Sequence, residues 1–373
     1  MRILYVTTVS GMMSFFQEHF KMLVKKGCEV ELACNNEFGL RSYIECFNFK
    51  IHDISFSRTP FSKRNIFAFL QIKELIKNGG YDVIHCHSPV AAFLTRIACF
   101  FCKNNAKVIY TAHGFHFYSG APIKNWVIYG VLEYFCSFIT DVLIVINQED
   151  YSFSQKHLHA KEIYYVPGVG FDKVGEGNGS CSSRREMRKI FKCLDEELLI
   201  VSVGELNDNK NHIVVINALA DLKKENPRLK FKFIICGKGN LKEKLLNAIE
   251  GFGLQKEVML LGYRNDISEI LNAADLFVFP SYREGLSVAL MEAMNKQLPV
   301  ICSRIRGNVD LIDKAGGYLF DPSDKEELLI CLKKFIQLTK KEKDAMGKCN
   351  QEKVDTFSTE RVLSELEKIY LLK

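Results

Sequence analysis

Apolar and polar residues alternate along the chain in two recurring patterns. Short runs rich in Val and Ile, such as residues 3–8, have the length of buried strands, while longer stretches such as 14–26 place apolar side chains every three or four positions. Repetition of this strand-then-helix order predicts parallel sheets covered by helices on both faces. Strands are expected at residues 3–8, 28–34, 82–86, 107–112, 142–146, 163–166, 198–203, 230–236, 258–261, 276–280 and 299–303. Helices are expected at 14–26, 69–77, 91–102, 126–138, 211–224, 241–252, 287–295 and 358–371.

The alternation stops once, in a Gly- and Ser-rich stretch from Pro167 to Arg184. A chain of 373 residues is longer than one hydrophobic core usually serves, so this stretch predicts a boundary between two Rossmann-like domains. In the tail, Ser358 is expected to cap a separate amphipathic helix. The expected parts are residues 1–170, a linker at 171–190, a second domain at 191–355 and a terminal helix at 356–373, and the helix's apolar side carries Leu363, Leu366, Ile369 and Tyr370.

The chain begins with a strand-like run and contains no stretch of about twenty uninterrupted apolar residues. We therefore expect a cytoplasmic protein whose membrane contact is peripheral. The thirteen cysteines lie in apolar segments, which favours reduced, buried thiols. Cys99 and Cys102 form a C-x-x-C, but no second pair completes a zinc site.

Positive charge is concentrated in one segment of the chain. Between Asp53 and Glu133 there are nine basic residues and two acidic ones, so the segment carries +7 (9 − 2) while the whole chain carries +6. Together with the aromatic residues around them, these cations fit an anionic lipid surface or a nucleic acid, and a solvated helix face accounts for them equally well. The cations are Arg58, Lys63, Arg64, Lys73, Lys77, Arg96, Lys103, Lys107 and Lys124; the aromatic residues are Phe61, Phe67, Phe69, Phe100, Phe101, Phe115, Phe117, Tyr118 and Trp126.

A candidate ligand site follows the strand expected at 276–280. Ligands of open parallel sheets bind at the carboxyl ends of the strands, where here a loop with Glu284 and Gly285 leads into a helix that carries Glu292. Free N–H groups of Leu286 and Ser287 at the helix start can hold a diphosphate, and the two carboxylates suit sugar and ribose hydroxyls. For an isolated pair, an acid favoured by the helix dipole and a second, solvated acid would be the simpler interpretation.

The pair is not isolated, because a series of motifs resembles glycosyltransferase family 4, in its capsule and exopolysaccharide branch. The family implies a GT-B fold, with two Rossmann-like domains facing across a cleft and a C-terminal helix that packs back toward the N-terminal domain. The second-half motifs are Val203-Gly204 with Lys210, Cys236-Gly237-Lys238-Gly239, Leu261-Gly262-Tyr263-Arg264, Ala274-Asp275, Pro280-Ser281 with Glu284-Gly285, Glu292-Ala293-Met294, Pro299-Val300-Ile301 and Gly316–Pro322. The first-half motifs are Thr8-Val9-Ser10-Gly11, Gly27–Val30, the strand ending at His87, and Thr111–Phe115.

The resemblance implies roles for individual residues. Glu284 corresponds to the glutamate near the transferred sugar, Glu292 to the one that holds the ribose, and Lys210 to a lysine that stabilises the departing diphosphate. His113 corresponds to a histidine that faces the sugar. The implied catalytic residues are His113, Glu284 and Lys210, and the implied donor-binding residues are Gly11, Gly204, Glu205, Lys210, Gly237, Tyr263, Arg264, Glu284, Gly285, Leu286, Ser287 and Glu292.

The resemblance also implies the reaction. A sugar moves with retention of configuration from a nucleotide-diphosphate donor, commonly a uridine-diphosphate (UDP) sugar, to a lipid-linked saccharide in capsule or exopolysaccharide assembly. Neither a metal nor another cofactor is expected, and neither is a nucleic-acid partner. We expect the enzyme at the inner face of the plasma membrane.

One position departs from the family pattern and keeps alternatives open. Glu205 stands where family members usually carry an arginine, so one phosphate-binding cation is missing. A sugar-nucleotide epimerase of the same fold and a non-catalytic nucleotide-sugar-binding subunit both stay possible. His85 and His87 can share one strand face as metal ligands, but the sequence shows no third ligand.

Overall fold

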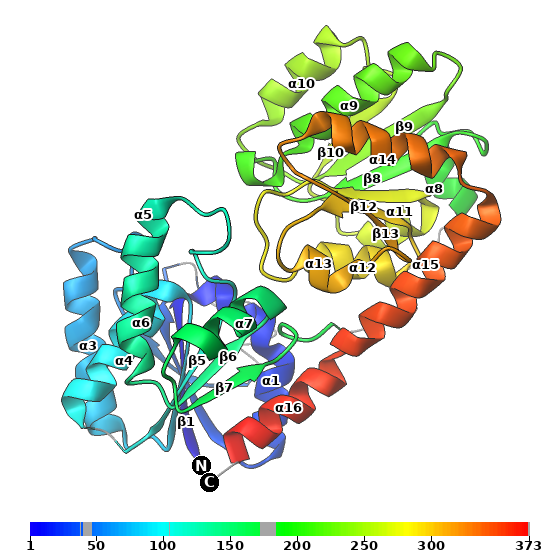
Figure 1. Ribbon diagram of the computed structural model, residues 1–373. Helices are drawn as coiled ribbons and strands as arrows, with labels where there is room; N and C mark the ends of the chain where they lie inside the picture. The colour runs from blue at the N-terminus through cyan, green and yellow to red at the C-terminus, as the bar shows by residue number, and fades with distance from the viewer. Residues whose placement is uncertain (38, 40–46, 104, 172–183, 372–373) are drawn as a thin grey trace. The chain divides into compact units, whose positions relative to one another are not determined.

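The computed structural model describes residues 1–37, 39, 47–103, 105–171 and 184–371, and the chain forms two compact units (Figure 1). Unit 1 comprises Met1–Gly170 together with Thr359–Lys373, and unit 2 comprises Phe171–Ser358. The chain therefore passes between the units twice, and its last helix belongs to the first unit.

Unit 1 is built on a parallel sheet with the strand order β3-β2-β1-β4-β5-β6-β7. The order reverses beside β1, because the chain first adds strands on one side of it and then returns to the other. In such a sheet the loops after β1 and β4 separate at their carboxyl ends and leave room for a ligand. The strands are β1 (Arg2–Val9), β2 (Glu29–Asn35), β3 (Lys50–Asp53), β4 (Val83–His87), β5 (Lys107–Ala112), β6 (Val142–Val145) and β7 (Glu162–Tyr165).

Helices cover both faces of this sheet, as the buried side chains of β1 show. Ile3 and Tyr5 pack in one cluster with the first and last helices of the chain, whereas Leu4 and Val6 point to the opposite cluster. The helical segments are η1 (Ser10–Phe16), α1 (Gln17–Lys25), α3 (Arg64–Gly79), α4 (Pro89–Cys102), α5 (Ile123–Asn125), the π-helical η2 (Trp126–Gly130), α6 (Val131–Ser137), α7 (Gln148–His157) and α16 (Thr359–Leu371).

The terminal helix α16 packs beside α1 on unit 1, which confirms that it returns to the N-terminal half. Leu366, Ile369 and Tyr370 are buried as expected. Val362 is fully buried as well, and Leu363 is half-buried, so the first inward position of the helix is Val362 in place of Leu363. An ion pair between Lys26 and Glu367 also joins α16 to the end of α1.

Unit 2 repeats the architecture with the parallel strand order β10-β9-β8-β11-β12-β13. Here the order reverses beside β8, so the loops after β8 and β11 flank the point of reversal. The strands are β8 (Leu198–Val203), β9 (Phe231–Cys236), β10 (Val258–Gly262), β11 (Leu276–Phe279), β12 (Val300–Ser303) and β13 (Gly317–Phe320). The helical segments are α8 (Arg184–Ile190), η3 (Asp208–Lys210), α9 (His212–Glu225), α10 (Lys242–Gly251), α11 (Ile267–Ala273), α12 (Val288–Asn295), α13 (Asn308–Leu311), α14 (Lys325–Gln337), α15 (Lys340–Val354) and η4 (Asp355–Phe357).

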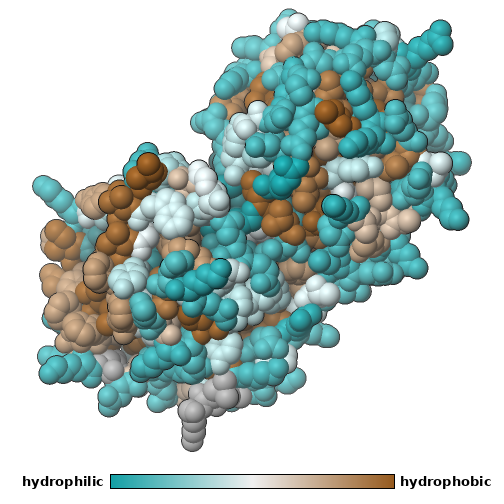
Figure 2. Space-filling view, in the orientation of Figure 1, coloured by the Kyte–Doolittle hydropathy of each residue, from teal (hydrophilic) through white to brown (hydrophobic). Residues whose placement is uncertain are grey.

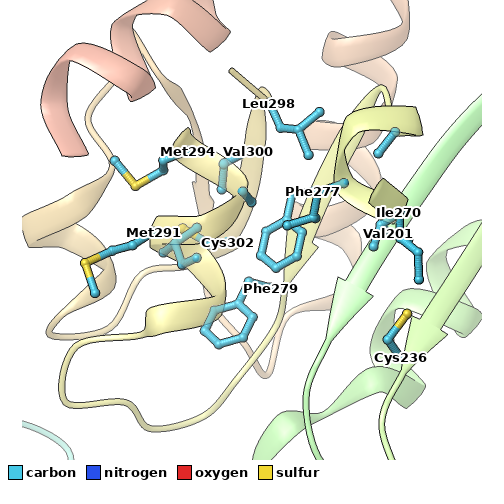
Figure 3. Close-up of a cluster of buried hydrophobic side chains, with 14 of the residues drawn as sticks. Val201, Cys236, Ile270, Phe277, Phe279, Met291, Met294, Leu298, Val300 and Cys302 are labelled. Atoms are coloured by element: carbon cyan, nitrogen blue, oxygen red, sulfur yellow. The ribbon is translucent and has the colours of Figure 1, made fainter. Parts of the chain in front are cut away.

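A dense apolar cluster fixes α12 against this sheet (Figure 3). Met291 and Met294 of α12 lie in the same buried cluster as Phe277 and Phe279 of β11, and all four are at most 3% exposed. Because the first turn of α12 follows the candidate loop directly, this packing also fixes where the loop ends.

The linker expectation needs one correction. Residues 172–183 lie outside the described residues, but 184–190 form α8, which packs in unit 2 through the buried side chains of Met187 and Arg188. The Gly- and Ser-rich composition ends before Arg184, so the helix belongs to the second domain. No element was expected at β3, α7, α11, β13, α14 or α15. Short edge strands and mostly polar helices such as α15 carry weak apolar patterns, whereas α14 buries Leu328, Leu329, Leu332 and Phe335, a helical spacing that was present in the sequence and was not recognised.

The helical expectation for 126–138 is met by η2 and α6, which continue α5. In the described parts of the chain, no helix combines the length and the apolar character needed to cross a bilayer.

Truncation of Leu366 should destabilise unit 1 measurably. Leu366→Ala removes a fully packed side chain from the contact of α16 with the sheet, which typically costs about 2–5 kcal/mol. Trp126 is the only tryptophan of the chain and lies in unit 1, so its fluorescence during urea unfolding reports on that unit. Arg361→Ala, on the exposed side of α16, is the control and should leave the midpoint unchanged. Equal midpoints for Leu366→Ala and wild type would contradict the packing.

Candidate active site

Two loops of unit 2 meet at the point where the strand order reverses. Lys210 ends η3 after β8, Glu284 lies in the loop after β11, and Lys210 Nζ is 2.6 Å from Glu284 Oε1. Both side chains are largely shielded from solvent, at 20% and 14% exposure, and the ammonium group lies 4.8 Å from the centre of the Phe279 ring. The structure thus brings together two residues that are 74 positions apart in the sequence.

Hydrogen bonds to backbone carbonyl oxygens also hold these loops in place. The side-chain amide of Asn209 donates to Arg283 O at 3.0 Å, and Tyr282 N donates to Asn209 O at 2.8 Å. Asn211 donates to Pro280 O at 3.3 Å and to Pro322 O at 2.8 Å. The loop after β8 is therefore anchored by four hydrogen bonds before any ligand is considered.

Sequence reasoning missed these asparagines as site residues. The run Asn207-Asp208-Asn209-Lys210-Asn211 is rich in residues that cap helices and form turns, and that composition was the available signal. Asn207 does cap η3, since its side-chain oxygen accepts from Lys210 N at 3.0 Å. The cap fixes the backbone from which Lys210 extends.

The glycines of the site have structural reasons of their own. A Cβ on Gly237 would lie 1.8 Å from Gly204 O, and a Cβ on Gly204 would lie 3.1 Å from the Lys210 side chain. Gly204 N donates to Cys236 O at 2.9 Å, so the loops after β8 and β9 are in backbone contact. Close packing therefore accounts for both Gly204 and Gly237. A contact with the donor is not needed to explain either glycine.

The loop Glu284–Ser287 delivers the chain to the start of α12. Ser287 caps this helix by accepting from Leu290 N at 3.3 Å, while Gly285 and Leu286 are half-exposed just before it. Gly307, at φ +79°, packs against the loop from behind, where a Cβ would lie 2.0 Å from Gly285 O. The first N–H groups of α12 are thus presented next to the Lys210–Glu284 pair.

Glu292 lies further along α12 and does not contact that pair. It is half-buried beside Phe171, Leu271 and Lys296, and burial raises the pKa of its carboxyl above the usual range although Lys296 opposes the shift. A carboxylate that is partly desolvated gains from hydrogen-bond donors such as ribose hydroxyls.

Three other expected donor residues are less integrated. Tyr263 is 68% exposed after β10, and Arg264 binds Asp266 through Nε at 2.8 Å. Since β10 is two strands away from β8, the structure does not place these residues with Lys210. Glu205 is exposed and forms no ion pair with the described residues, so its carboxylate has no structural partner.

In unit 1 the matching loops follow β1 and β4. Gly11 lies in η1 after β1, exposed, and a Cβ there would meet nothing within 4 Å. His87 ends β4, and its Nδ1 is 3.0 Å from Nε2 of His113, which follows β5. The structure thus joins His113 to a histidine that the sequence analysis had considered only as a metal ligand.

The His87 ring is fixed by its neighbours. It lies against Tyr5, Phe16 and His85 with ring centroids 4.6, 4.4 and 4.1 Å apart. His85 in turn contacts Thr111 Oγ1 at 2.7 Å and the Tyr370 hydroxyl of α16. No group of three His, Cys, Asp or Glu side chains among the described residues is arranged to hold a metal ion.

The protonation of this histidine pair follows from burial. Desolvation, with a smaller contribution from His19, lowers the pKa of His113 to about 4, and burial holds the pKa of His87 well below its usual range, so both rings are neutral at pH 7. One of them donates in the 3.0 Å contact. His87 Nε2 is buried and has no partner in the described part of the chain.

This unpaired nitrogen decides the direction of the hydrogen bond. If His113 donated, His87 would carry its proton on Nε2 as a buried N–H without an acceptor, which folded proteins rarely tolerate. His87 Nδ1–H therefore donates to His113 Nε2. His113 then carries its own proton on Nδ1, and that N–H has no partner among the described residues.

The surface of unit 1 corrects part of the expected basic and aromatic patch. Arg96 is buried and binds Glu133 at 2.8 Å beneath the Tyr110 ring, so it contributes no surface charge. Phe115 and Phe117 belong to the core. The exposed apolar side chains instead gather over α3, the end of α4, and η2 with α6 (Figure 2). They are Phe61, Ile66, Phe67, Leu70, Phe100, Phe101, Ile123, Trp126, Val127, Val131, Leu132, Tyr134, Phe135 and Phe138.

Comparison with known proteins identifies two sequence families. Residues 183–353 match the family described as glycosyl transferases group 1, and residues 2–147 match the family described as glycosyl transferase 4-like. The chain is 32% identical to the putative glycosyltransferase EpsD of Bacillus subtilis, over 99% of this chain and 96% of that one. It is 27% identical, over 97% and 94% of the two chains, to the Escherichia coli UDP-Gal:alpha-D-GlcNAc-diphosphoundecaprenol alpha-1,3-galactosyltransferase.

Solved structures agree on the fold. The Anabaena protein Alr3699/HepE, crystallised with UDP, superposes with a TM-score of 0.77 at 18% identity, covering 99% of both chains. At this identity the likeness extends to the fold alone.

The tautomer of His113 can be tested directly. In protein labelled with 15N-histidine, the His113 signals, assigned by their loss in His113→Asn, should show a protonated Nδ1 and an unprotonated Nε2. His87→Phe removes the donor and should shift His113 toward the Nε2–H form. His87→Asn keeps an amide donor near the position of Nδ1 and should preserve the wild-type signature. A protonated Nε2 on His113 in the wild type would refute the assignment.

Proposed function

Since the chain belongs to glycosyltransferase family 4, with its GT-B fold, we propose that it transfers a sugar from a UDP-sugar, with retention of configuration, to a lipid-linked saccharide in capsule or exopolysaccharide assembly. The observation that carries the proposal is the Lys210–Glu284 pair at the strand reversal of unit 2. The crystallised UDP complex of HepE and the diphosphoundecaprenol acceptor in the name of the Escherichia coli relative support it.

In the proposed reaction, Lys210 stabilises the charge of the departing diphosphate, and no metal is needed for that purpose. Glu284 accepts from hydroxyls of the transferred sugar, N–H groups of Leu286 and Ser287 bind the diphosphate, and Glu292 accepts from the ribose. The bond from the anomeric carbon to the diphosphate oxygen breaks, and a bond to the acceptor oxygen forms on the same face. The acceptor's proton passes to the departing diphosphate, so no nucleophile from the protein is required.

His113 contributes a neutral N–H donor in this scheme. Its Nδ1–H can bind a sugar hydroxyl without adding charge, because the ring stays unprotonated at neutral pH. His87 acts as a positioning residue, since it fixes which nitrogen of His113 carries the proton.

The proposed donor site can be tested by substituting each partner of the Lys210–Glu284 ion pair in turn. Lys210→Met should weaken UDP binding at least tenfold, about 1.4 kcal/mol, because the diphosphate loses its cation. Glu284→Gln should keep or tighten UDP binding, since it releases Lys210 from its partner, yet it should abolish transfer. Calorimetry with UDP and assays of UDP release with each UDP-sugar measure both effects, and the product's anomeric configuration shows whether transfer retains it.

Lys242→Met is the matched control, as it removes an exposed lysine of unit 2 that forms no ion pair with the described residues. Unchanged UDP affinity in Lys210→Met, or wild-type turnover in Glu284→Gln, would contradict the assigned roles.

The acceptor's lipid places the reaction at a membrane, and we propose that unit 1 docks at its inner face. Arg58, Lys63 and Arg64 are exposed beside Phe61 and the apolar face of α3. Apolar side chains with neighbouring cations suit the headgroup boundary, and each cation near an anionic surface contributes about 1 kcal/mol. Lys73 is half-buried and lies 5.7 Å from the Phe101 ring, so we give it a smaller part than the sequence suggested.

Charge reversal should therefore release the protein from vesicles. The variant Arg58→Glu, Lys63→Glu, Arg64→Glu should lose sedimentation with anionic liposomes at low salt while UDP binding persists. The same charge change at Lys242, Lys244 and Lys256, which are exposed in unit 2, is the control and should leave sedimentation intact. Equal sedimentation of both variants, or no binding by the wild type, would reject docking through this surface.

A further inference from the structure

Unit 1 contains an apolar hollow of about 230 Å³, and Phe61 is the one lining residue that the proposed docking surface names. Its walls come from three places: Pro60 and Phe61 before α3, Phe93 and Leu94 in the first turns of α4, and Tyr129 and Leu132 of η2 and α6. These side chains are half-buried or exposed, and Leu94 and Tyr129 pack against the core beneath, so the floor of the hollow is fixed while Phe61 lies at its open mouth.

The one charged side chain in the wall is already satisfied. Glu133 is 7% exposed, with Oε2 accepting from Arg96 at 2.8 Å and Oε1 accepting from the Tyr110 hydroxyl at 3.2 Å. The interior therefore offers no free charge to a ligand. An apolar chain is the occupant that gains from entering it, because polar groups would lose their hydration without a partner.

The size of the hollow favours a single hydrocarbon chain over the flat surface of a bilayer as its occupant. If each carbon needs a volume close to the roughly 30 Å³ of a water molecule, the hollow takes about eight carbon atoms. The flat side of a bilayer cannot fill such a depression, whereas one branched hydrocarbon chain can. The broader apolar face over α3 and α6 is left for the bilayer itself.

In contrast to the apolar interior, the sequence around Pro60 and Phe61 carries positive charge. Arg58 precedes Pro60 by two residues, Lys63 and Arg64 follow Phe61 by two and three, and all three cations are exposed. These cations do not line the hollow themselves, but they flank two of its lining residues in the chain, and such cations are complementary to a hydrocarbon chain that ends in phosphate groups.

The position of the hollow connects it to the candidate acceptor site. Pro89 and Val90, which also line it, follow His87 by two and three residues at the carboxyl end of β4. Ser88 joins them in a left-handed conformation at φ +63°, and Thr8 N donates to its hydroxyl at 3.0 Å. The hollow thus opens from the same edge of the sheet that presents the His87–His113 pair.

The geometry points to this hollow as the binding site for the phosphate-proximal isoprenoid units of a polyprenyl diphosphate acceptor, with Arg58, Lys63 and Arg64 holding the diphosphate. This inference rests on the proposed function and specifies its acceptor. The relatives from Escherichia coli and Campylobacter jejuni carry diphosphoundecaprenol acceptors in their names, which agrees with this chemistry.

Monomeric farnesyl diphosphate, titrated into the full chain without vesicles, tests the site apart from membrane docking. Calorimetry should show it binding at least a hundredfold more tightly than inorganic diphosphate, and more tightly than dodecyl diphosphate, which has the same head group on an unbranched chain. Leu94→Trp fills the hollow and should lower farnesyl diphosphate affinity at least tenfold. Leu70→Trp, the same change at an exposed site on α3 outside the hollow, should lower it less than twofold.

A second variant tests the same site independently, in case Leu94→Trp does not fold. Phe61 is 80% exposed, so Phe61→Asp cannot disturb the core, yet it brings a carboxylate to the mouth and should also lower affinity at least tenfold. UDP binding should be unchanged in both variants, because Lys210, Leu286, Ser287 and Glu292, which are proposed to bind the UDP moiety, lie in unit 2. Equal affinity of the wild type for farnesyl diphosphate and inorganic diphosphate, or full affinity in Phe61→Asp, would overturn the site.

The outcomes separate this inference from the proposed function. Tight farnesyl diphosphate binding without transfer from any UDP-sugar would sustain the site and reject the proposed reaction. Equally efficient transfer to an acceptor saccharide with and without its lipid would sustain the reaction and reject the site.

Discussion

The ion pair between Lys210 and Glu284 spans the point in unit 2 where the strand order reverses, and the surrounding loops are arranged around it. A parallel sheet that reverses beside β8 separates the loops after β8 and β11, so these loops need contacts of their own. The pair at 2.6 Å and the hydrogen bonds of Asn209 supply those contacts. A Cβ at position 204 would press on the Lys210 side chain at 3.1 Å, and the carbonyl of Gly204 excludes a Cβ at position 237. Gly204 is thus favoured by where the lysine lies, and Gly237 is required by the backbone of the loop that carries the lysine.

Much of this was accessible from the sequence because the information is local. The apolar runs predicted nearly all central strands, since a strand buried on both faces is apolar along its length. The motif around Glu284 predicted a loop before a helix, and Ser287 does cap α12. Edge strand β3 and helix α15 were not predicted because their side chains are mostly polar and exposed. No period of apolar residues therefore distinguishes them from loops.

Contacts between segments that are distant in the sequence could not be predicted. Arg96 counted as surface charge because Glu133 lies 37 residues away, and only the fold shows that the two neutralise each other inside unit 1. His87 stood in a pattern compatible with a metal ligand, and its actual partner, His113, comes from the next strand. Tyr370 reaches His85 from 285 residues away. Such pairings depend on strand order, which no local pattern encodes.

The two units differ in the kind of polar group they present, and this difference is consistent with a division of chemical tasks. Unit 2 presents a lysine and two glutamates, groups that bind a charged diphosphate and the hydroxyls of a sugar nucleotide. Unit 1 presents histidines whose burial keeps them uncharged at neutral pH, with the pKa of His113 near 4. A neutral N–H donor can orient a hydroxyl without binding a phosphate tightly, since it lacks the charge that strengthens such bonds. A donor that carries two phosphates would therefore bind its diphosphate through unit 2, whereas the carboxyl edge of unit 1 suits the uncharged hydroxyls of a sugar, and cations would be needed in unit 1 only where the lipid diphosphate of an acceptor would lie.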